Sequence, residues 1–306
     1  MNPGIGIGSI KSVTEFIKQI LIIQMVMFLC CSSSQSTYEF SKINYEKIPV
    51  LFIHGHGMAS RSWNQLIDYL RESGYPIQFL RAIQLVPNDG PNIDAAENQI
   101  APFVEEFLCD VNKYLASAQP GAPAKTKIDI VSHSMGALSA RWYVAKLRPD
   151  RVRTWISLAG ANHGSNALCA YVGRDRGGAD DLCPAFAQTE KESSIQFILN
   201  GKPFISDVDE TPYGLGQDSS GVQSIPADDQ RSIFYITLRT IKDEWIIPDE
   251  SAVLDGAGGK SFVIPPDIPA VEYPPGNIRM ENKVRHDAML KDGQTLRLVK
   301  VILELK

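Results

Sequence analysis

The chain has 306 residues, of which 30 are basic and 35 are acidic, and its formal net charge is -5 at pH 7. This mixed charge excludes the strongly basic footprint of a nucleic-acid-binding protein, so no nucleic-acid partner is expected. A hydrophobic content of 44% and a mean hydropathy of -0.11 are typical of a globular protein with a sizeable core. The length accommodates one large domain or two small ones.

The first 36 residues have the features of a secretory signal peptide rather than of a folded core. A weakly basic head precedes the apolar run Ile20–Cys31, which is too short to span a bilayer comfortably. Small residues follow this run, so we expect cleavage after Ser36 and secretion of residues 37–306. The alternatives are an uncleaved membrane anchor and lipidation of Cys30 or Cys31.

Beyond the leader, strand and helix patterns alternate, which predicts an α/β fold with right-handed crossovers and a parallel sheet. The first strand ends in the glycine-rich loop His54–Gly57, where a backbone can approach a ligand closely. Pro102 is expected to kink the longest helix or to mark its true start. The patterns predict strands at 48–53, 77–80, 127–131, 153–159, 232–238 and 278–280, and helices at 63–73, 94–117, 137–147, 193–199 and 296–305.

The regular alternation stops after the strand at 153–159. Residues 161–230 are rich in loops, and long loops inside an α/β domain are often lids, so we expect a cap over the site. A solvated surface insertion is the alternative. Cys169 and Cys183 bracket a Gly/Asp-rich loop in this segment and are expected to form a disulfide, which secretion permits. Cys109, beside Leu108 in a helical pattern, is expected to be a buried free thiol.

Val131–Gly136 separates a predicted buried strand from a predicted helix, and it contains Ser134 among small neighbours. A serine on such a strand-to-helix turn is forced to the end of the sheet, where its oxygen can attack a substrate. The N-terminus of the following helix directs free N–H groups at developing negative charge. Ser132 stands where the usual Gly-x-Ser-x-Gly pattern has its first glycine. An ordinary turn with a serine-rich loop is the structural alternative.

A serine nucleophile needs a base, and the base needs an orienting carboxylate. In the α/β-hydrolase order the nucleophile comes first, the acid second and the base last. This order favours His286, in a late loop, as the base, with His163 as the alternative. For the acid it favours Asp243, which lies just beyond the strand at 232–238. The competing carboxylates are Glu244, Asp249 and Asp255.

Acyl transfer also needs hydrogen-bond donors for the tetrahedral oxyanion, each worth ~3 kcal/mol in the transition state. The residue after the nucleophile, Met135, supplies one backbone N–H, and His56 in the first glycine-rich loop supplies the other. This chemistry requires no metal and no organic cofactor. The acidic stretch 207–210 could bind calcium, but its spacing matches no EF-hand and a solvated loop is the commoner outcome.

These motifs resemble those of secreted lipases with the α/β-hydrolase fold, close to the class 2 (bacterial-type) triacylglycerol lipases. The resemblance runs from about Val50 to His286 and is strong only in the patches His54–Gly57, Val131–Gly136, Ser157–Gly164 and the late pair Asp243/His286. It implies a mostly parallel sheet with helices on both faces, a triad of Ser134, Asp243 and His286, an ester or lipid substrate and transient contact with a lipid interface.

Residues 130–136 and 158–160 are also similar to some extracellular polyhydroxybutyrate depolymerases, so a short-chain esterase or a depolymerase is the alternative. Ser132 and the cysteine-bearing cap depart from the lipase pattern and leave the acyl-chain length and any interfacial activation open. A catalytically inactive binding protein and an amidase or peptidase would share the fold. All triad candidates are present, which counts against the inactive binding protein, whereas an amidase or peptidase shares the triad and only substrate turnover separates it from an ester hydrolase. The sequence leaves the oligomeric state open.

Overall fold

The computed structural model describes residues 43–187, 194–200, 233–254 and 263–305. They belong to one compact unit, Ser41–Lys306. The expected signal peptide, the acidic stretch 207–210, Asp255 and much of the expected cap lie outside the described residues. None of the helices within the described ranges combines the length and the hydropathy that a bilayer crossing requires.

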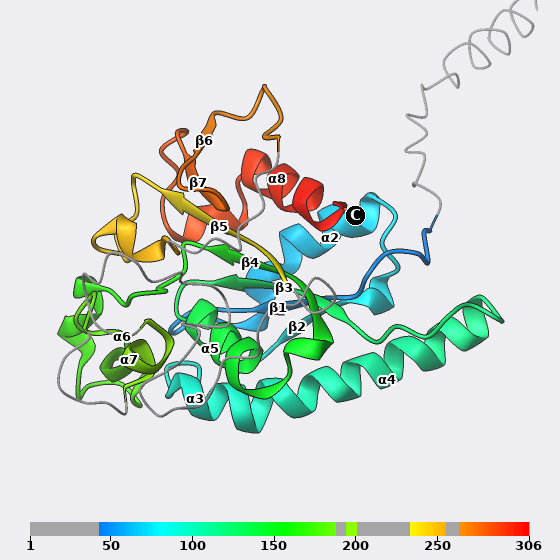
Figure 1. The fold of residues 1–306 in the computed structure, drawn as a ribbon, viewed down its shortest axis with the longest axis horizontal. Helices are drawn as coiled ribbons and strands as arrows, with labels where there is room; N and C mark the ends of the chain where they lie inside the picture. Colours follow the sequence, from blue (N-terminus) through cyan, green and yellow to red (C-terminus); the bar gives the residue numbers. More distant parts are fainter. Residues whose placement is uncertain (1–42, 188–193, 201–232, 255–262, 306) are drawn as a thin grey trace, which may run out of the picture. The chain divides into compact units, whose positions relative to one another are not determined.

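A seven-stranded sheet runs through the described part of the chain (Figure 1). Its strand order is β2-β1-β3-β4-β5-β7-β6, and every neighbouring pair is parallel except β7 with β6. The predicted α/β architecture with a mostly parallel sheet is confirmed. The strands are β1 (Val50–Ile53), β2 (Leu80–Ile83), β3 (Ile128–His133), β4 (Val152–Leu158), β5 (Phe234–Thr240), β6 (Ala270–Glu272) and β7 (Asn277–Met280).

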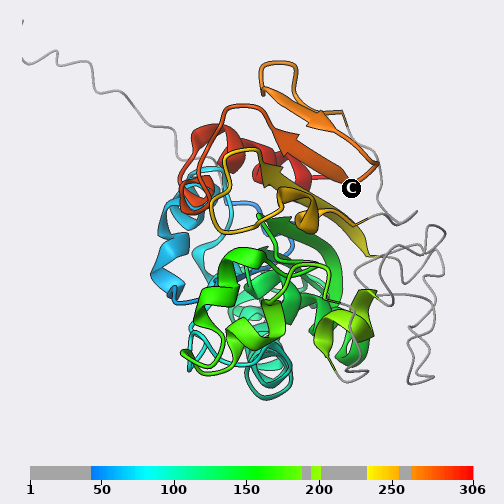
Figure 2. The ribbon, with the colours of Figure 1, turned by 90° about the vertical axis from the view of Figure 1, so that its left-hand side faces the viewer.

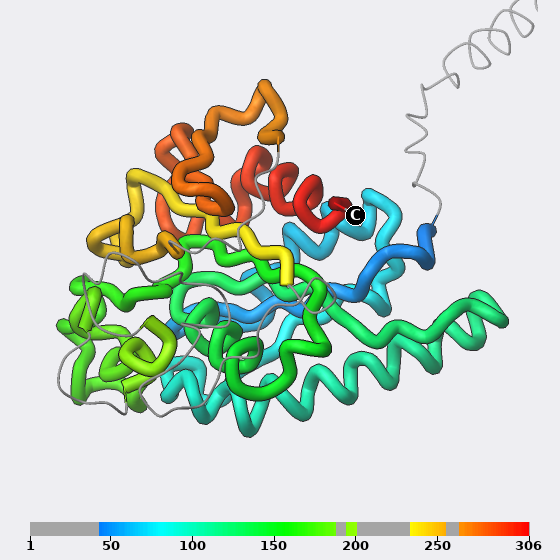
Figure 3. Tube along the Cα trace, viewed as in Figure 1, coloured from blue at the N-terminus to red at the C-terminus, as the bar shows by residue number. Residues whose placement is uncertain are grey.

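Helices cover both faces of this sheet, which is why β1 and β3 are buried along their whole length. Figures 1 and 3 show α2 (Asn64–Glu72) beside α8 (Gly293–Leu303) on one face. The opposite face carries α3 (Asn92–Asp94), α4 (Ala101–Ala118) and α5 (Gly136–Trp142). The core therefore has two helix–sheet layers, and the carboxyl ends of the parallel strands lie at one edge.

The longest predicted helix, 94–117, is present as a helical run from Asn92 to Ala118 with an irregularity before Pro102. Residues Ala95–Ile100 form a π-helical segment, and α4 begins at Ala101. Pro102 thus marks the start of the regular α-helix, because it has no N–H to donate within a continuous ladder.

Three local predictions were wrong. Residues Ile77–Phe79 form a 3₁₀ turn and the strand begins only at Leu80, because Ile77 is apolar but 46% exposed. Cys109 is a free but exposed cysteine, since it faces away from the side of α4 that carries the buried residues Phe107 and Leu108. Strand β6 lies in the Pro/Gly-rich stretch where no strand was expected, and it pairs only with β7 at the edge of the sheet.

The described part of the expected cap contains a 3₁₀ helix at Asn166–Tyr171 and two short helices, α6 (Gly178–Leu182) and α7 (Ile195–Asn200). In Figure 2 this green segment lies below the yellow-to-red chain that begins at residue 233. Cys169 and Cys183 are linked, as the sequence predicted, and the bond closes the loop that leads into α6.

Candidate active site

Ser134 follows the last residue of β3 and has a φ of 55°, a left-handed conformation that is strained for a residue with a side chain. Such strain costs about 1–3 kcal/mol and persists only where the surroundings hold it. The Ser134 N–H donates to the Leu158 carbonyl, and its own carbonyl accepts from the Ala161 N–H, both at 3.1 Å. A Cβ at Gly136 would collide with the His54 carbonyl, so glycine is needed where α5 packs on the end of β1.

Ser132, the departure from the usual motif, has a structural role inside the sheet. Its Oγ accepts a hydrogen bond from Trp155 Nε1 at 2.9 Å and donates to the Ile156 carbonyl at 3.3 Å. Both partners belong to β4, so the hydroxyl joins two neighbouring strands just before Ser134. The substitution of the first glycine therefore leaves the turn at Ser134 intact.

The structure brings Asp243 and His286 together behind Ser134. Nδ1 of His286 lies 2.9 Å from both carboxylate oxygens of Asp243, and the two side chains are only 3% and 2% exposed. Oδ1 of Asp243 also accepts from the N–H groups of Trp245 at 2.9 Å and Ile246 at 2.7 Å. Ser134 and His286 line one pocket. The pairing expected from chain order is thus present as geometry.

Glu244 holds the backbone N–H of His286 and the side chain of its neighbour Arg285. Glu244 accepts from the His286 N–H at 3.2 Å and from Arg285 Nε at 2.8 Å. Burial acts to raise the pKa of Glu244, but these hydrogen bonds outweigh it and lower the pKa. Glu244 therefore supports the main chain of His286 rather than its ring. Another competing acid, Asp249, pairs with Arg239 at 2.9 Å.

His163, the alternative base, is turned to another part of the structure. Its Nδ1 donates to the Ser251 carbonyl at 3.0 Å, and its ring stacks on Phe186 with centroids 5.0 Å apart. It is absent from the set of described residues that line the Ser134 pocket. The geometry consequently favours His286 over His163.

Two other histidines are buried and neutral. His54 Nδ1 donates to the Gly55 carbonyl at 2.9 Å, and its Nε2 accepts from the Leu85 N–H at 3.1 Å. His133 Nε2 donates to the His286 carbonyl at 3.3 Å. Burial lowers the pKa of His54, and burial together with the nearby His286 lowers that of His133 well below its ordinary value.

We expect the free energy of unfolding to fall as the pH falls below about 6.5, the ordinary pKa of histidine. Below this pH the two histidines bind protons in the unfolded chain but not in the folded one. Each of them therefore changes the free energy of unfolding by up to about 1.4 kcal/mol per pH unit. Urea unfolding between about pH 8 and about pH 5 measures the slope. His133→Gln should reduce this slope by the equivalent of up to one bound proton. An unchanged slope would contradict the lowered pKa of His133.

The two expected oxyanion donors lie at the same edge of the sheet as Ser134. His56 lines the Ser134 pocket, and Met135 is the buried residue between Ser134 and α5. The N–H groups of His56 and Met135 have no hydrogen-bond acceptor among the described residues. The structure therefore has two backbone donors near the serine, as acyl transfer requires.

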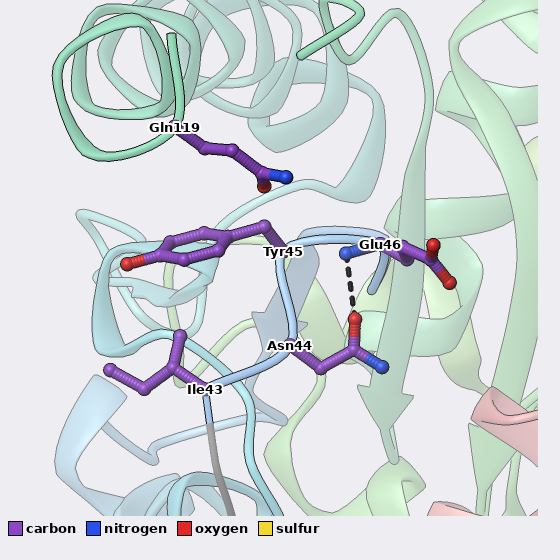
Figure 4. Close-up of a pocket in the computed structure, with 5 residues that line it drawn as sticks. All are labelled: Ile43, Asn44, Tyr45, Glu46 and Gln119. Atoms are coloured by element: carbon purple, nitrogen blue, oxygen red, sulfur yellow. Dashed lines mark hydrogen bonds between the residues drawn. The ribbon is translucent and has the colours of Figure 1, made fainter.

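The pocket at Ser134 has a volume of about 350 Å³. Its apolar wall is formed by Met58, Leu168, Tyr171 and Trp245. Beside it, Tyr171, Val172 and Ile247 are 39–43% exposed and form an apolar rim. A second pocket of about 540 Å³, between Tyr45 and Gln119 (Figure 4), has no histidine or serine in its wall and holds no comparable chemistry.

Three side chains among the described residues place possible metal ligands within 4.8 Å of one another: His133, His286 and Asp287. The rings of His133 and His286 pack together with centroids 4.4 Å apart, and each ring already binds a protein oxygen. The two ring planes are tilted by 46° to each other, and one nitrogen of each ring is already engaged by a protein oxygen. This cluster is accounted for by packing around His286.

Sequence reasoning missed some residues of this site. Asp175 binds the His56 side chain at 2.7 Å, although 119 positions separate them and no motif connects them. His133 supports the His286 carbonyl; its place before the serine was visible, but its partner was not.

Comparisons with known proteins identify the family of the chain. The chain matches the model of a family described as lipase (class 2) over residues 47–255, which is more than half of its length. It is similar to the mature form of the Bacillus licheniformis lipase BlEst2 over 87% of this chain and 95% of that one, with 16% identity and a TM-score of 0.50, a likeness that shows the fold alone.

Two further structures match with lower scores. The propeptide form of the same Bacillus lipase matches over 43% of this chain, with 24% identity and a TM-score of 0.34, and this chain spans 26% of that one. The product of the Listeria innocua gene lin2722 matches over 85% of this chain and 95% of its own, with 13% identity and a TM-score of 0.43.

Proposed function

The chain belongs to the class 2 lipase family and is a lipolytic hydrolase of carboxylic esters with the α/β-hydrolase fold, and from this premise we propose that it works through an acyl-enzyme on Ser134. The observation that carries this proposal is the buried hydrogen bond between His286 and Asp243 in the pocket that Ser134 lines. A positive φ at Ser134 supports it, because strained backbone clusters at catalytic positions.

In the proposed mechanism, Ser134 Oγ attacks the acyl carbon while Nε2 of His286 takes the hydroxyl proton. Asp243 holds Nδ1–H and stabilises the imidazolium that forms. The N–H groups of His56 and Met135 bind the oxyanion of the tetrahedral intermediate. The intermediate collapses by expelling the alcohol, which receives the proton from His286. Water, deprotonated by His286, then hydrolyses the acyl-enzyme and releases the acid and free Ser134.

We propose a triacylglycerol or similar lipid ester as the substrate. The apolar wall around Leu168 and Trp245 suits an acyl chain, and the exposed rim of Tyr171, Val172 and Ile247 suits transient contact with a lipid interface. A chain exported with its leader removed after Ser36 would meet such a substrate outside the cell. A disulfide within the chain is compatible with that compartment.

A series of p-nitrophenyl esters from acetate to palmitate tests the function, using protein expressed with its own N-terminus and collected from the medium. We expect turnover that rises with chain length, labelling by a fluorophosphonate probe, and an N-terminus at Thr37. Turnover confined to short esters would replace the lipase with an esterase or polyester depolymerase. No turnover and no label would favour a non-catalytic binding protein, and an intact leader would refute the proposed secretion signal.

A further inference from the structure

The loop closed by the Cys169–Cys183 disulfide contacts both residues proposed as oxyanion donors. Inside this loop, a carboxylate oxygen of Asp175 lies 2.7 Å from Nε2 of His56. Gly178 packs so closely on the other donor residue that a Cβ there would lie 2.8 Å from Met135 Sδ. One short loop therefore contacts both halves of the proposed oxyanion hole.

The Asp175 carboxylate is itself firmly held. Its side chain is 4% exposed, and it accepts from the N–H groups of Gly177 at 3.1 Å and Ala179 at 2.7 Å. Burial acts to raise the pKa of Asp175, but the hydrogen bonds from His56, Gly177 and Ala179 outweigh it and lower the pKa. The group is therefore a fixed anion near neutral pH and a strong partner for an imidazole N–H.

His56 needs such a partner because its backbone lies between two glycines. Gly57 has a φ of 68°, and glycine restricts the neighbouring peptide less than any other residue. The Gly57 N–H is bound to the Asn88 carbonyl at 2.9 Å, which fixes the far side of the loop. The Met58 N–H donates to the Gly55 carbonyl at 3.2 Å across the turn that contains His56. The His56 ring contacts the Tyr171 ring, with centroids 5.8 Å apart, and its hydrogen bond to Asp175 is the polar contact that fixes the imidazole.

We propose that Asp175 is a positioning residue that, through the imidazole of His56, directs the His56 N–H at the oxyanion. The inference rests on the proposed function, because it assumes that His56 and Met135 are the donors. Misplacing a catalytic group by about 1 Å can cost about 10²-fold in rate. A carboxylate that never touches the substrate thus acts on the transition state.

The test is Asp175→Ala, assayed on a p-nitrophenyl ester, with rates expressed per site titrated by a fluorophosphonate. We expect kcat to fall roughly tenfold to a hundredfold while KM stays within about twofold, because the oxyanion exists only in the transition state. The inhibition constant of a trifluoromethyl ketone, which adds to Ser134 as a tetrahedral oxyanion, should rise by the same factor. Collapse of the pocket would instead raise KM or lower the number of titrated sites.

Asp181→Ala, the same change six residues further along the loop, is the matched control. Asp181 lies in the same loop and accepts from the Asn92 N–H at 2.6 Å, and its contacts among the described residues do not include His56. The control should lose stability and keep its kcat per titrated site. His56→Ala combined with Asp175→Ala should be no slower than His56→Ala alone, because one acts through the other.

Three results would overturn the inference: a wild-type kcat in Asp175→Ala, an equal loss in Asp181→Ala, or losses that multiply in the double variant. Each of these requires an active wild type. A wild type that neither reacts with the fluorophosphonate nor hydrolyses any ester would instead refute the proposed function, so the two failures are distinguishable.

Discussion

Ser134→Ala is expected to lower kcat for ester hydrolysis about 10⁶-fold, which is the order of loss when the nucleophile of a serine hydrolase is removed. No other group can form the acyl-enzyme in the proposed mechanism, so what remains is catalysis by the oxyanion donors alone. The variant should fold as the wild type does, since alanine keeps the Cβ and the two backbone bonds to Leu158 and Ala161. Initial rates on a p-nitrophenyl ester and urea unfolding measure both quantities.

Ser132→Ala is the matched control for this variant. It removes a serine hydroxyl two residues before Ser134, inside β3, and leaves Trp155 Nε1 buried without its acceptor. We expect a loss of about 1–3 kcal/mol in the free energy of unfolding and a kcat per folded molecule close to that of the wild type. Rates near the wild type in Ser134→Ala would show that the strand-to-helix turn at Ser134 is not the catalytic one.

The second large effect is expected for His286→Ala, which should cost at least ~10³-fold in kcat. Without the imidazole, Ser134 has no base and the leaving alcohol has no acid. The variant also leaves a carboxylate buried, since the Asp243 side chain is 2% exposed and keeps, among the described residues, the N–H groups of Trp245 and Ile246 as partners. The free energy of unfolding should fall as well, so kcat must be expressed per folded molecule, with the folded fraction measured by urea unfolding.

His163→Ala provides the comparison for His286→Ala. Its hydrogen bond to the Ser251 carbonyl and its contact with Phe186 are structural, so we expect a change in stability and little change in kcat. A larger loss of kcat in His163→Ala than in His286→Ala would reassign the base.

The parts of the site that the sequence predicted are those encoded by neighbouring residues. Lys127–Leu147 contains its own strand, serine turn and helix, because alternation, a small residue and helical periodicity all act within a few positions. The late pair of Asp243 and His286 followed from chain order, and the structure places their side chains 2.9 Å apart. Their catalytic roles stay predictions until the variants are measured.

Other features depend on which face a residue turns to its neighbours. Cys109 follows the buried apolar residues Phe107 and Leu108 in the chain, yet it is exposed because the other side of α4 packs against the sheet. Ile77 is apolar but exposed. Strand β6 forms because its backbone pairs antiparallel with β7 at the edge of the sheet. Local composition does not reveal these outcomes, since burial is decided by the element that packs alongside.

The sequence by itself predicted the order of the strands and helices except β6, the serine turn, the favoured disulfide pair and the candidates for base and acid, because periodicity, turn residues and motif order are local or sequential properties. Only the tertiary structure showed that His286 lines the Ser134 pocket while His163 binds the Ser251 carbonyl. It also placed Glu244 and His133 against the His286 backbone and joined Asp175 to His56. Such contacts join side chains far apart in the chain, and their geometry is set by how the sheet and its loops pack.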